Sequence, residues 1–316
     1  MRQCLDGWDG SDRIVETWRK HESLISIDSL QSALRKQQYI AGRGLTTSLY
    51  LALTLGRPLF LEGETGVGKT EVAKVLATLL GTELIRLQCY EGLDVHHAVY
   101  EWNYARQMMS IRMAEGRGQE IEDTDIFGPQ FLLKRPLMQA LEYSGSCPAV
   151  LLIDEIDRSD DEFEALLLEI LSEFQITIPE LGTVRASEPP IVVLTSNRTR
   201  EIHDALKRRC VYCWIEFPSF ERELEIVRAK VPDAPGQLAR QVTAYVQEIR
   251  HEDLYKTPGV AETLDWLTAL VTLNKKALEI DVVEETLGVI LKYQDDIQKM
   301  KGGPAIAALE RVRSRD

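Results

Sequence analysis

The sequence lacks a long apolar run and an excess of positive charge. Its 316 residues include 37 basic and 50 acidic side chains, which gives a formal net charge of −13. An acidic chain disfavours non-specific binding to nucleic acid or to an anionic membrane, although it leaves room for a local basic patch. The most apolar stretch, residues 51–61, is interrupted at Gly56, Arg57 and Pro58 and is shorter than the roughly 18 residues that span a bilayer. We therefore expect no transmembrane segment.

Cysteines are also few. There are five, an odd number without the spacing of a disulfide framework, and the first eight residues lack the apolar core of a signal peptide. Both features predict a protein of the reducing cytoplasm. Cys210 and Cys213 form a single C-x-x-C pair with no second pair and no histidine cluster nearby, so ordinary burial is favoured over a metal or redox site.

What the chain does contain is an alternation of short apolar runs with helical patterns, followed by helical patterns alone. Buried strands are expected at 59–61, 84–87, 149–153, 191–194 and 211–217, and helices at 45–55, 71–80 and 162–174. This order predicts an α/β fold with a parallel, doubly wound sheet. We divide the chain into an N-terminal segment (1–35), an α/β core (36–218), a smaller all-α lid (219–298) and a flexible tail (299–316).

The strongest motif is a glycine-rich loop between the first strand and its following helix. It reads Gly63-Glu64-Thr65-Gly66-Val67-Gly68-Lys69-Thr70 and fits G-x-x-x-x-G-K-[ST] in full. Backbone N–H groups of such a loop surround phosphate oxygens, at the N-terminus of a helix that attracts the same anion. Lys69 is expected to reach the β- and γ-phosphates, and Thr70 to place its hydroxyl on Mg²⁺. The motif predicts binding of ATP with Mg²⁺.

Two acidic residues, Asp154 and Glu155, close the apolar run at 149–153. The carboxyl ends of parallel strands form the ligand-binding edge of such a sheet. Asp154 would hold Mg²⁺, and Glu155 would act as general base on the attacking water. The alternative is an acidic helix start, because further carboxylates follow from Asp157. That alternative leaves unexplained why two acids end a buried strand.

Two further polar groups follow in the chain. Asn197 comes just after the strand at 191–194 and could bind the lytic water or the γ-phosphate, although asparagine at this place is also ordinary turn chemistry. Lys207, Arg208 and Arg209 form a basic cluster before the last strand. One of these guanidinium groups could reach a neighbouring subunit's γ-phosphate as an arginine finger. Cations at a helix C-terminus are the simpler alternative.

The order of these motifs resembles that of the AAA+ ATPases. The stretches 154–158, 166–169 and 173–177 resemble the MoxR group, and 89–94 with 100–104 resemble its subgroup that contains the CoxD accessory ATPase of carbon-monoxide dehydrogenase maturation. The resemblance implies a P-loop core with a five-stranded parallel sheet, an insert in the second helix and a hairpin before sensor 1. It makes Asp154 and Glu155 Walker B, Asn197 sensor 1 and Arg209 the finger. No arginine stands at 257–262, where the family's sensor 2 is expected.

The same resemblance implies a function. An ATP-driven remodeller of a protein client would work as a homo-oligomeric ring, expected to be a hexamer, with a von Willebrand factor A-domain partner and a metalloenzyme client. A nucleic-acid motor or loader is the main alternative, and the net charge of −13 argues against it. A P-loop kinase or a GTPase is a weaker alternative. For a GTPase, the string Asn274-Lys275-Lys276-Ala277 lacks the aspartate of a guanine-binding motif.

Overall fold

The computed structural model describes residues 25–118 and 126–314. Their contacts divide the chain into two units. The first unit holds the described residues of 1–33, 42–62 and 70–214, and the second holds 34–41, 63–69 and the described residues from 215 onward. The last segment of the second unit thus begins at Ile215, whereas we placed the boundary at Pro218. It also contains most of the glycine-rich loop.

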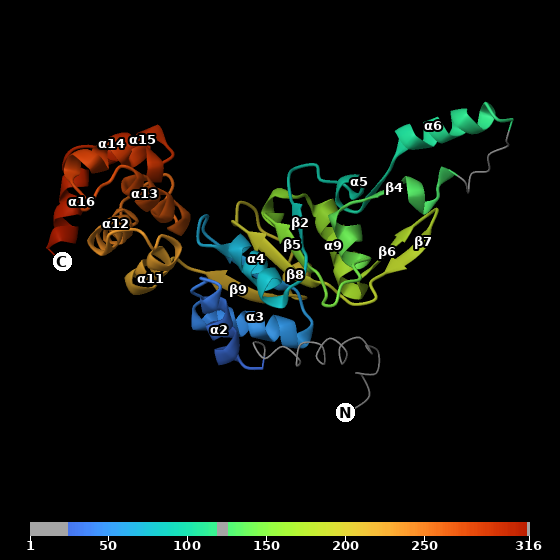
Figure 1. Ribbon diagram of the computed structural model, residues 1–316, viewed down its shortest axis with the longest axis horizontal. Coiled ribbons are helices and arrows are strands. Elements are labelled where there is room, and N and C mark those ends of the chain that lie inside the picture. Colours follow the sequence, from blue (N-terminus) through green and yellow to red (C-terminus); the bar gives the residue numbers. More distant parts are fainter. Residues whose placement is uncertain (1–24, 119–125, 315–316) are drawn as a thin grey trace. The chain divides into compact units, whose positions relative to one another are not determined.

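A five-stranded sheet forms the centre of the fold, as predicted (Figure 1). The strand order is β2-β5-β8-β1-β9, and the registers of β2 with β5, β5 with β8 and β8 with β1 are parallel. All five residues of β5 are buried. Alternate side chains leave opposite faces, so Leu151 and Ile153 join the main core while Val150 and Leu152 are buried on the other face. The strands are β1 (Leu59–Gly63), β2 (Leu84–Gln88), β5 (Val150–Asp154), β8 (Ile191–Ser196) and β9 (Val211–Ile215).

The helices around the sheet are α2 (Ile27–Lys36), α3 (Arg43–Leu55), α4 (Lys69–Leu80), α8 (Pro136–Leu141), α9 (Asp161–Glu173) and α10 (Asp204–Lys207), with 3₁₀ turns η2 (Pro129–Phe131) and η3 (Ile156–Arg158). Among them, α3, α4 and α9 correspond to the helices predicted at 45–55, 71–80 and 162–174. Helix α2 begins at Ile27, directly after Ser26. Ser26 Oγ accepts the Ser29 N–H at 3.1 Å, so Asp28 lies in the first turn.

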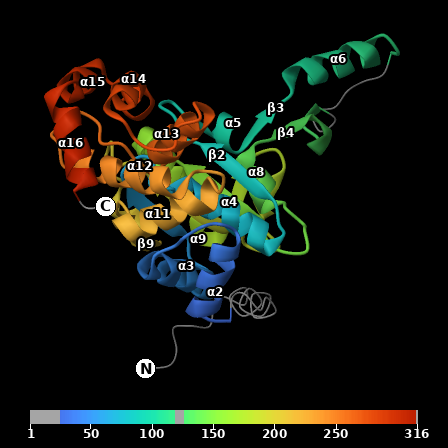
Figure 2. The same cartoon turned by 60° about the vertical axis from the view of Figure 1, so that its left-hand side comes forward.

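Between β2 and β5 an insert leaves the sheet. It comprises α5 (Val95–Ala98), β3 (Tyr100–Trp102), α6 (Tyr104–Glu115) and β4 (Leu132–Lys134), with β3 and β4 antiparallel. Figures 1 and 2 show α6 beyond the β3–β4 ribbon, away from the sheet of its own unit. Only Gln107 of α6 is buried. The apolar side chains of Tyr104, Met108, Met109 and Met113 are each more than half exposed.

The expected hairpin follows α9 directly. It consists of β6 (Gln175–Ile178) and β7 (Gly182–Arg185), paired antiparallel. Phe174 ends α9 in the left-handed conformation, with φ +47°, and its N–H donates to Ile170 O at 2.7 Å. The chain therefore reverses within one residue and enters the hairpin.

The second unit is built around helices that we call the lid. They are α11 (Phe220–Lys230), α12 (Gly236–Ile249), α13 (Val260–Thr272), α14 (Ile280–Ile290), α15 (Gln294–Met300) and α16 (Gly303–Arg313). The flexible tail predicted from residue 299 is wrong for residues 303–313. Helix α16 buries Ala305, Ala308, Leu309 and Val312 in the lid core, because these residues form one apolar stripe at helical spacing. Within the described residues no helix has the length and apolarity to cross a membrane.

Candidate functional site

The glycine-rich loop folds around a lysine ammonium. Gly66 and Gly68 have φ values of +80° and +90°, which a residue with a Cβ rarely adopts. Lys69 is buried, and its Nζ donates to Gly63 O and to Glu64 O, both at 2.7 Å. Helix α4 begins at Lys69, so backbone N–H groups, a helix N-terminus and an ammonium belong to one short segment. This donor set fits a phosphate chain.

Thr70 follows Lys69 directly and contacts the first acidic residue of β5. Thr70 Oγ1 donates to Asp154 Oδ1 at 3.0 Å, and Thr195 Oγ1 donates to the same oxygen at 2.5 Å. Asp154 is 2% exposed. Mg²⁺ binds through one or two protein oxygens together with phosphate and water oxygens. A hydroxyl and a carboxylate 3.0 Å apart therefore fit Mg²⁺ brought by a nucleotide.

Glu155 stands in a left-handed backbone conformation at the end of β5, with φ +55° and ψ +51°. Such a conformation is costly outside glycine and persists where surrounding contacts hold it. Asn197 Nδ2 donates to its Oε1 at 3.3 Å, and Gln88 Nε2 to its Oε2 at 3.0 Å. Arg158 Nε lies 3.0 Å from Oε2, and Thr195 Oγ1 accepts the Glu155 N–H at 3.0 Å. Four side chains thus hold this residue in place.

Asp157 anchors the chain after β8. Its Oδ1 accepts the Asn197 N–H at 3.1 Å, and its Oδ2 accepts the N–H and hydroxyl of Thr199 at 2.9 and 2.7 Å. Burial by itself raises the pKa of Asp157, but the hydrogen bonds from Thr199 and Asn197 outweigh burial and leave this pKa below its usual value. The ionised carboxylate therefore fixes the backbone of Asn197, whose side chain faces Glu155.

The predicted arginines lie elsewhere on the first unit. Arg208 and Arg209 are both exposed after α10. The Arg209 guanidinium donates to Leu168 O and Ser172 Oγ, which lie on α9. The structure thus joins Thr70, Asp154, Glu155 and Asn197 in one acidic cluster and leaves the arginine pair on the surface.

Four residues that contact this cluster were absent from our predicted site: Arg86, Gln88, Arg158 and Thr195. Gln88 lies opposite Asp154 in the parallel register of β2 with β5. Arg86 Nε donates to Asp154 Oδ2 at 3.0 Å. The available signal was the alternation of Arg86 and Gln88 with apolar neighbours, which puts both on one face of a strand. Thr195 stands within the predicted polar strand end, beside the Asn197 that we selected.

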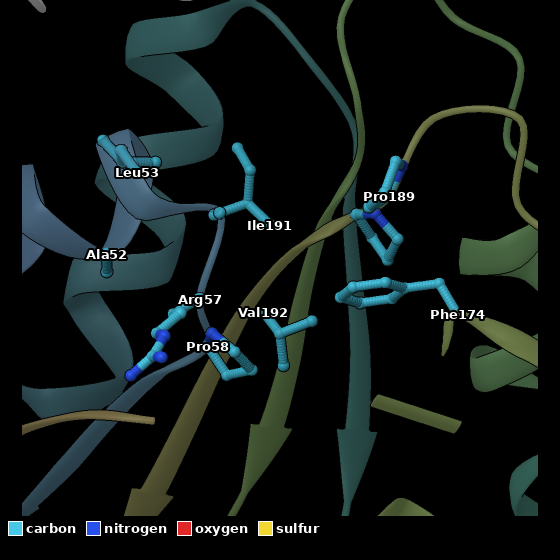
Figure 3. A pocket seen from close by; sticks show the side chains of 10 residues that line it. Ala52, Leu53, Arg57, Pro58, Phe174, Pro189, Ile191 and Val192 are labelled. Atoms are coloured by element: carbon cyan, nitrogen blue, oxygen red, sulfur yellow. The ribbon is translucent and has the colours of Figure 1, made fainter. Parts of the chain in front are cut away.

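A separate small pocket of about 20 Å³ lies at the opposite end of the strands. Figure 3 shows Phe174 and Pro189 on one side of it and Ala52 and Leu53 on the other. It adjoins the starts of β1 and β8, whereas ligands of open α/β sheets bind at the carboxyl ends. Its volume suits about one water molecule. We assign it no part in the candidate site.

The cysteines of the C-x-x-C pair behave as core residues. Cys210 and Cys213 are both buried, and burial raises the pKa of the Cys210 thiol to about 12. Among the residues that the structure describes, no group of three or more His, Cys, Asp or Glu side chains could hold a metal ion. Ordinary burial accounts for the pair.

The chain is similar to several known proteins. Residues 58–210 match the family model described as the AAA domain of the dynein-related subfamily. Gas vesicle ATPase GvpN of Haloferax mediterranei is 25% identical over 260 residues, covering 79% of this chain and 73% of that protein. The uncharacterized protein YehL of Escherichia coli is 27% identical over 311 residues, covering 85% and 78%. The Thermotoga maritima RuvB Holliday junction branch migration motor aligns with a TM-score of 0.45 at 18% identity, over 84% of this chain and 71% of that one.

Proposed function

We propose that residues 58–210, which match the family model described as the AAA domain of the dynein-related subfamily, form a AAA+ ATPase domain that binds ATP with Mg²⁺ and hydrolyses it at the acidic cluster. The observation that carries the proposal is the convergence of Thr70, Asp154, Glu155 and Asn197 from separate segments. Lys69 and the N–H groups of Gly63–Thr70 would hold the phosphates. Thr70 and Asp154 would hold Mg²⁺, which neutralises charge on the phosphate oxygens.

Glu155 is proposed as the general base. Its carboxylate would accept a proton from the attacking water, a role that depends on where its two oxygens point. Asn197 and Gln88 each donate to one of those oxygens, and the left-handed backbone at Glu155 directs the side chain. Asn197 would thus act as sensor 1 by linking the base to the strand end.

We further propose a homo-oligomeric ring, expected to be a hexamer, with Arg209 as a finger acting on the neighbouring subunit and Arg208 beside it. Exposure of both side chains supports this role, since a finger must reach outside its own subunit. The contacts of Arg209 with Leu168 O and Ser172 Oγ would set its direction on the surface.

The proposed work of the ring is the remodelling of a protein client, as in MoxR-type ATPases. Helix α6 supports a polypeptide client, because Met108, Met109 and Met113 give it a flexible exposed apolar surface. The relative named a gas vesicle ATPase supports ATP hydrolysis by this chain. The von Willebrand factor A-domain partner, the metalloenzyme client and the CoxD-like subgroup stay predictions from the resemblance. The net charge of −13 disfavours the nucleic-acid alternative.

The test is the ATP hydrolysis rate per subunit measured against protein concentration. We expect the rate to rise with assembly, and Arg209→Ala to remove that rise while the exposed control Arg228→Ala keeps it. Lys69→Ala should abolish nucleotide binding. Glu155→Gln should bind ATP and lose turnover by orders of magnitude, whereas the exposed control Glu162→Gln should not. Rapid turnover by Glu155→Gln, or a rate independent of concentration and of Arg209, would contradict these roles.

The client needs a separate experiment. Glu155→Gln held in ATP should trap the assembled state, and purified candidate partners can then be tested for binding to it. Replacing Met108 and Met109 by serine should weaken client binding without changing the ATP hydrolysis rate measured alone. Stimulation of ATPase activity by DNA or RNA, lost at moderate salt, would instead favour the nucleic-acid motor.

A further inference from the structure

Within the second unit, the N-terminus of α13 rests directly on the glycine-rich loop. The Ala261 N–H donates to Gly66 O at 3.2 Å. A Cβ added to Gly259 would lie 2.6 Å from Thr65 O and 2.8 Å from Gly66 Cα. A Cβ added to Gly66 would in turn lie 3.1 Å from Gly259 Cα. The two backbones therefore meet directly, and the Glu262 carboxylate lies beside both glycines, with its Oε2 2.9 Å from the Cβ position of Gly66 and 3.0 Å from that of Gly259.

This contact completes the cap of α13. The first N–H groups of a helix have no partner inside the helix, and an N-cap side chain usually accepts one of them. Gly259 is the N-cap and has no side chain to offer. Its own N–H is accepted by Glu262 Oε2 at 2.9 Å, while the Ala261 N–H goes to Gly66 O. The loop supplies the acceptor that the N-cap lacks.

Close approach, not backbone conformation, requires the glycine at 259. Its φ of −85° and ψ of −175° are open to any residue. Gly66 differs, because its φ of +80° is itself unfavourable for other residues. Gly259 is therefore the position where the contact can be disturbed without straining the backbone.

We infer that the Gly66 carbonyl caps α13 and thereby couples nucleotide binding on the loop to the lid, with Gly259 as a positioning residue. The inference rests on the nucleotide site proposed above. Phosphates that bind the loop's N–H groups hold its backbone in one conformation, and that backbone presents Gly66 O to α13. Because coupling is reciprocal, displacing α13 must weaken nucleotide binding by the same factor. The coupling uses the stretch 257–262, which lacks the arginine expected of a sensor 2.

The first test compares Gly259→Ser with the wild-type chain. Serine is a good N-cap residue, but its Cβ would collide with Thr65 O. The variant therefore keeps a cap on α13 while it loses the contact with the loop. We expect the Kd for a fluorescent ATP analogue to rise on the order of fivefold or more, with KM raised and kcat kept. The matched control is Gly288→Ala in α14, where an added Cβ meets nothing within 4 Å. It should leave Kd unchanged.

The second test measures hydrogen exchange at the Ala261 amide of the wild-type chain with and without Mg²⁺ and ATP. Nucleotide should slow exchange there, and Gly259→Ser should lose most of that slowing. If the wild-type chain fails to bind ATP, the proposed nucleotide site is wrong. If it binds ATP while Gly259→Ser binds equally well, or while Ala261 exchange ignores nucleotide, the coupling is overturned. If Gly259→Ser fails to fold, the coupling is still tested by whether ATP slows exchange at the Ala261 amide of the wild-type chain.

Discussion

Arg86 Nε lies 3.0 Å from Asp154 Oδ2, so an arginine of β2 is paired with the proposed Mg²⁺ ligand of β5. The Asp154 side chain is 4% exposed and the Arg86 side chain 50% exposed. A buried carboxylate is costly unless it is paired and hydrogen-bonded. Arg86, Thr70 and Thr195 together satisfy both of its oxygens.

Arg86→Ala is expected to destabilise the first unit. The variant removes the cation from a buried carboxylate, and a hydrogen bond to a charged group contributes about 1.5–3 kcal/mol. Because Arg86 is half exposed, the loss should fall at the lower end of that range. Urea unfolding measures it, with Arg43→Ala as a control at the exposed Arg43–Asp28 pair. Equal effects of the two variants would show that the pairing with Asp154 adds no stability.

Thr199→Val should lower stability at neutral pH and matter less in acid. The hydrogen bonds to Asp157 outweigh burial and depress its pKa, so they stabilise the fold above the unfolded-state pKa near 4. That stability is lost as the pH falls through the folded-state value. We expect urea unfolding to show a deficit of about 1–2 kcal/mol at pH 7 that shrinks as the pH falls through the lowered folded-state pKa of Asp157. The exposed hairpin control Thr183→Val should show no such dependence, and a deficit that stays equal as the pH falls would refute the role of the charge.

Glu223→Ala should destabilise the lid. Glu223 is fully buried and accepts from Gln247, Arg250 and Thr263, with Arg250 Nη2 at 2.7 Å from Oε1. Removing it leaves a buried guanidinium unpaired, which costs about 3–5 kcal/mol. Thermal unfolding should show a lowered Tm for this variant. Asp253→Ala, which breaks the exposed pair with Lys299, should leave the Tm unchanged. A similar Tm for both variants would count against the buried pair.

The described cysteines should differ in reactivity at pH 8. Burial, followed by repulsion from Asp154, raises the pKa of Cys89 to about 12, and burial does the same for Cys210. The thiolate is the reactive form, so only about one Cys89 or Cys210 side chain in ten thousand is reactive at that pH. Partly exposed Cys147 should be alkylated first by iodoacetamide, as mass spectrometry can show. Labelling of Cys89 or Cys210 at the rate of Cys147 would contradict this, and urea should make all three react.

Local patterns sufficed for the elements and the motifs. The buried strands, the helix ends at Gly56 and Gly81, and the loop from Gly63 to Thr70 depend on residues close in the chain, because side-chain period and φ preference are local properties. The parallel sheet followed from the alternation of strands with helices. The sequence alone thus determined the fold class and the residues expected at the carboxyl ends of β1, β5 and β8.

Only the tertiary structure decided which side chains meet those residues. The strand order β2-β5-β8-β1-β9 does not follow the chain, so the pairing of Arg86 with Asp154 and of Gln88 with Glu155 depends on the β2–β5 register. The burial of α16 and the contact of Gly259 with Gly66 are also decided by the tertiary structure. Apolar spacing shows that a helix face is buried, but it does not identify the element that packs against this face. Contacts between distant segments arise from packing, which no local pattern encodes.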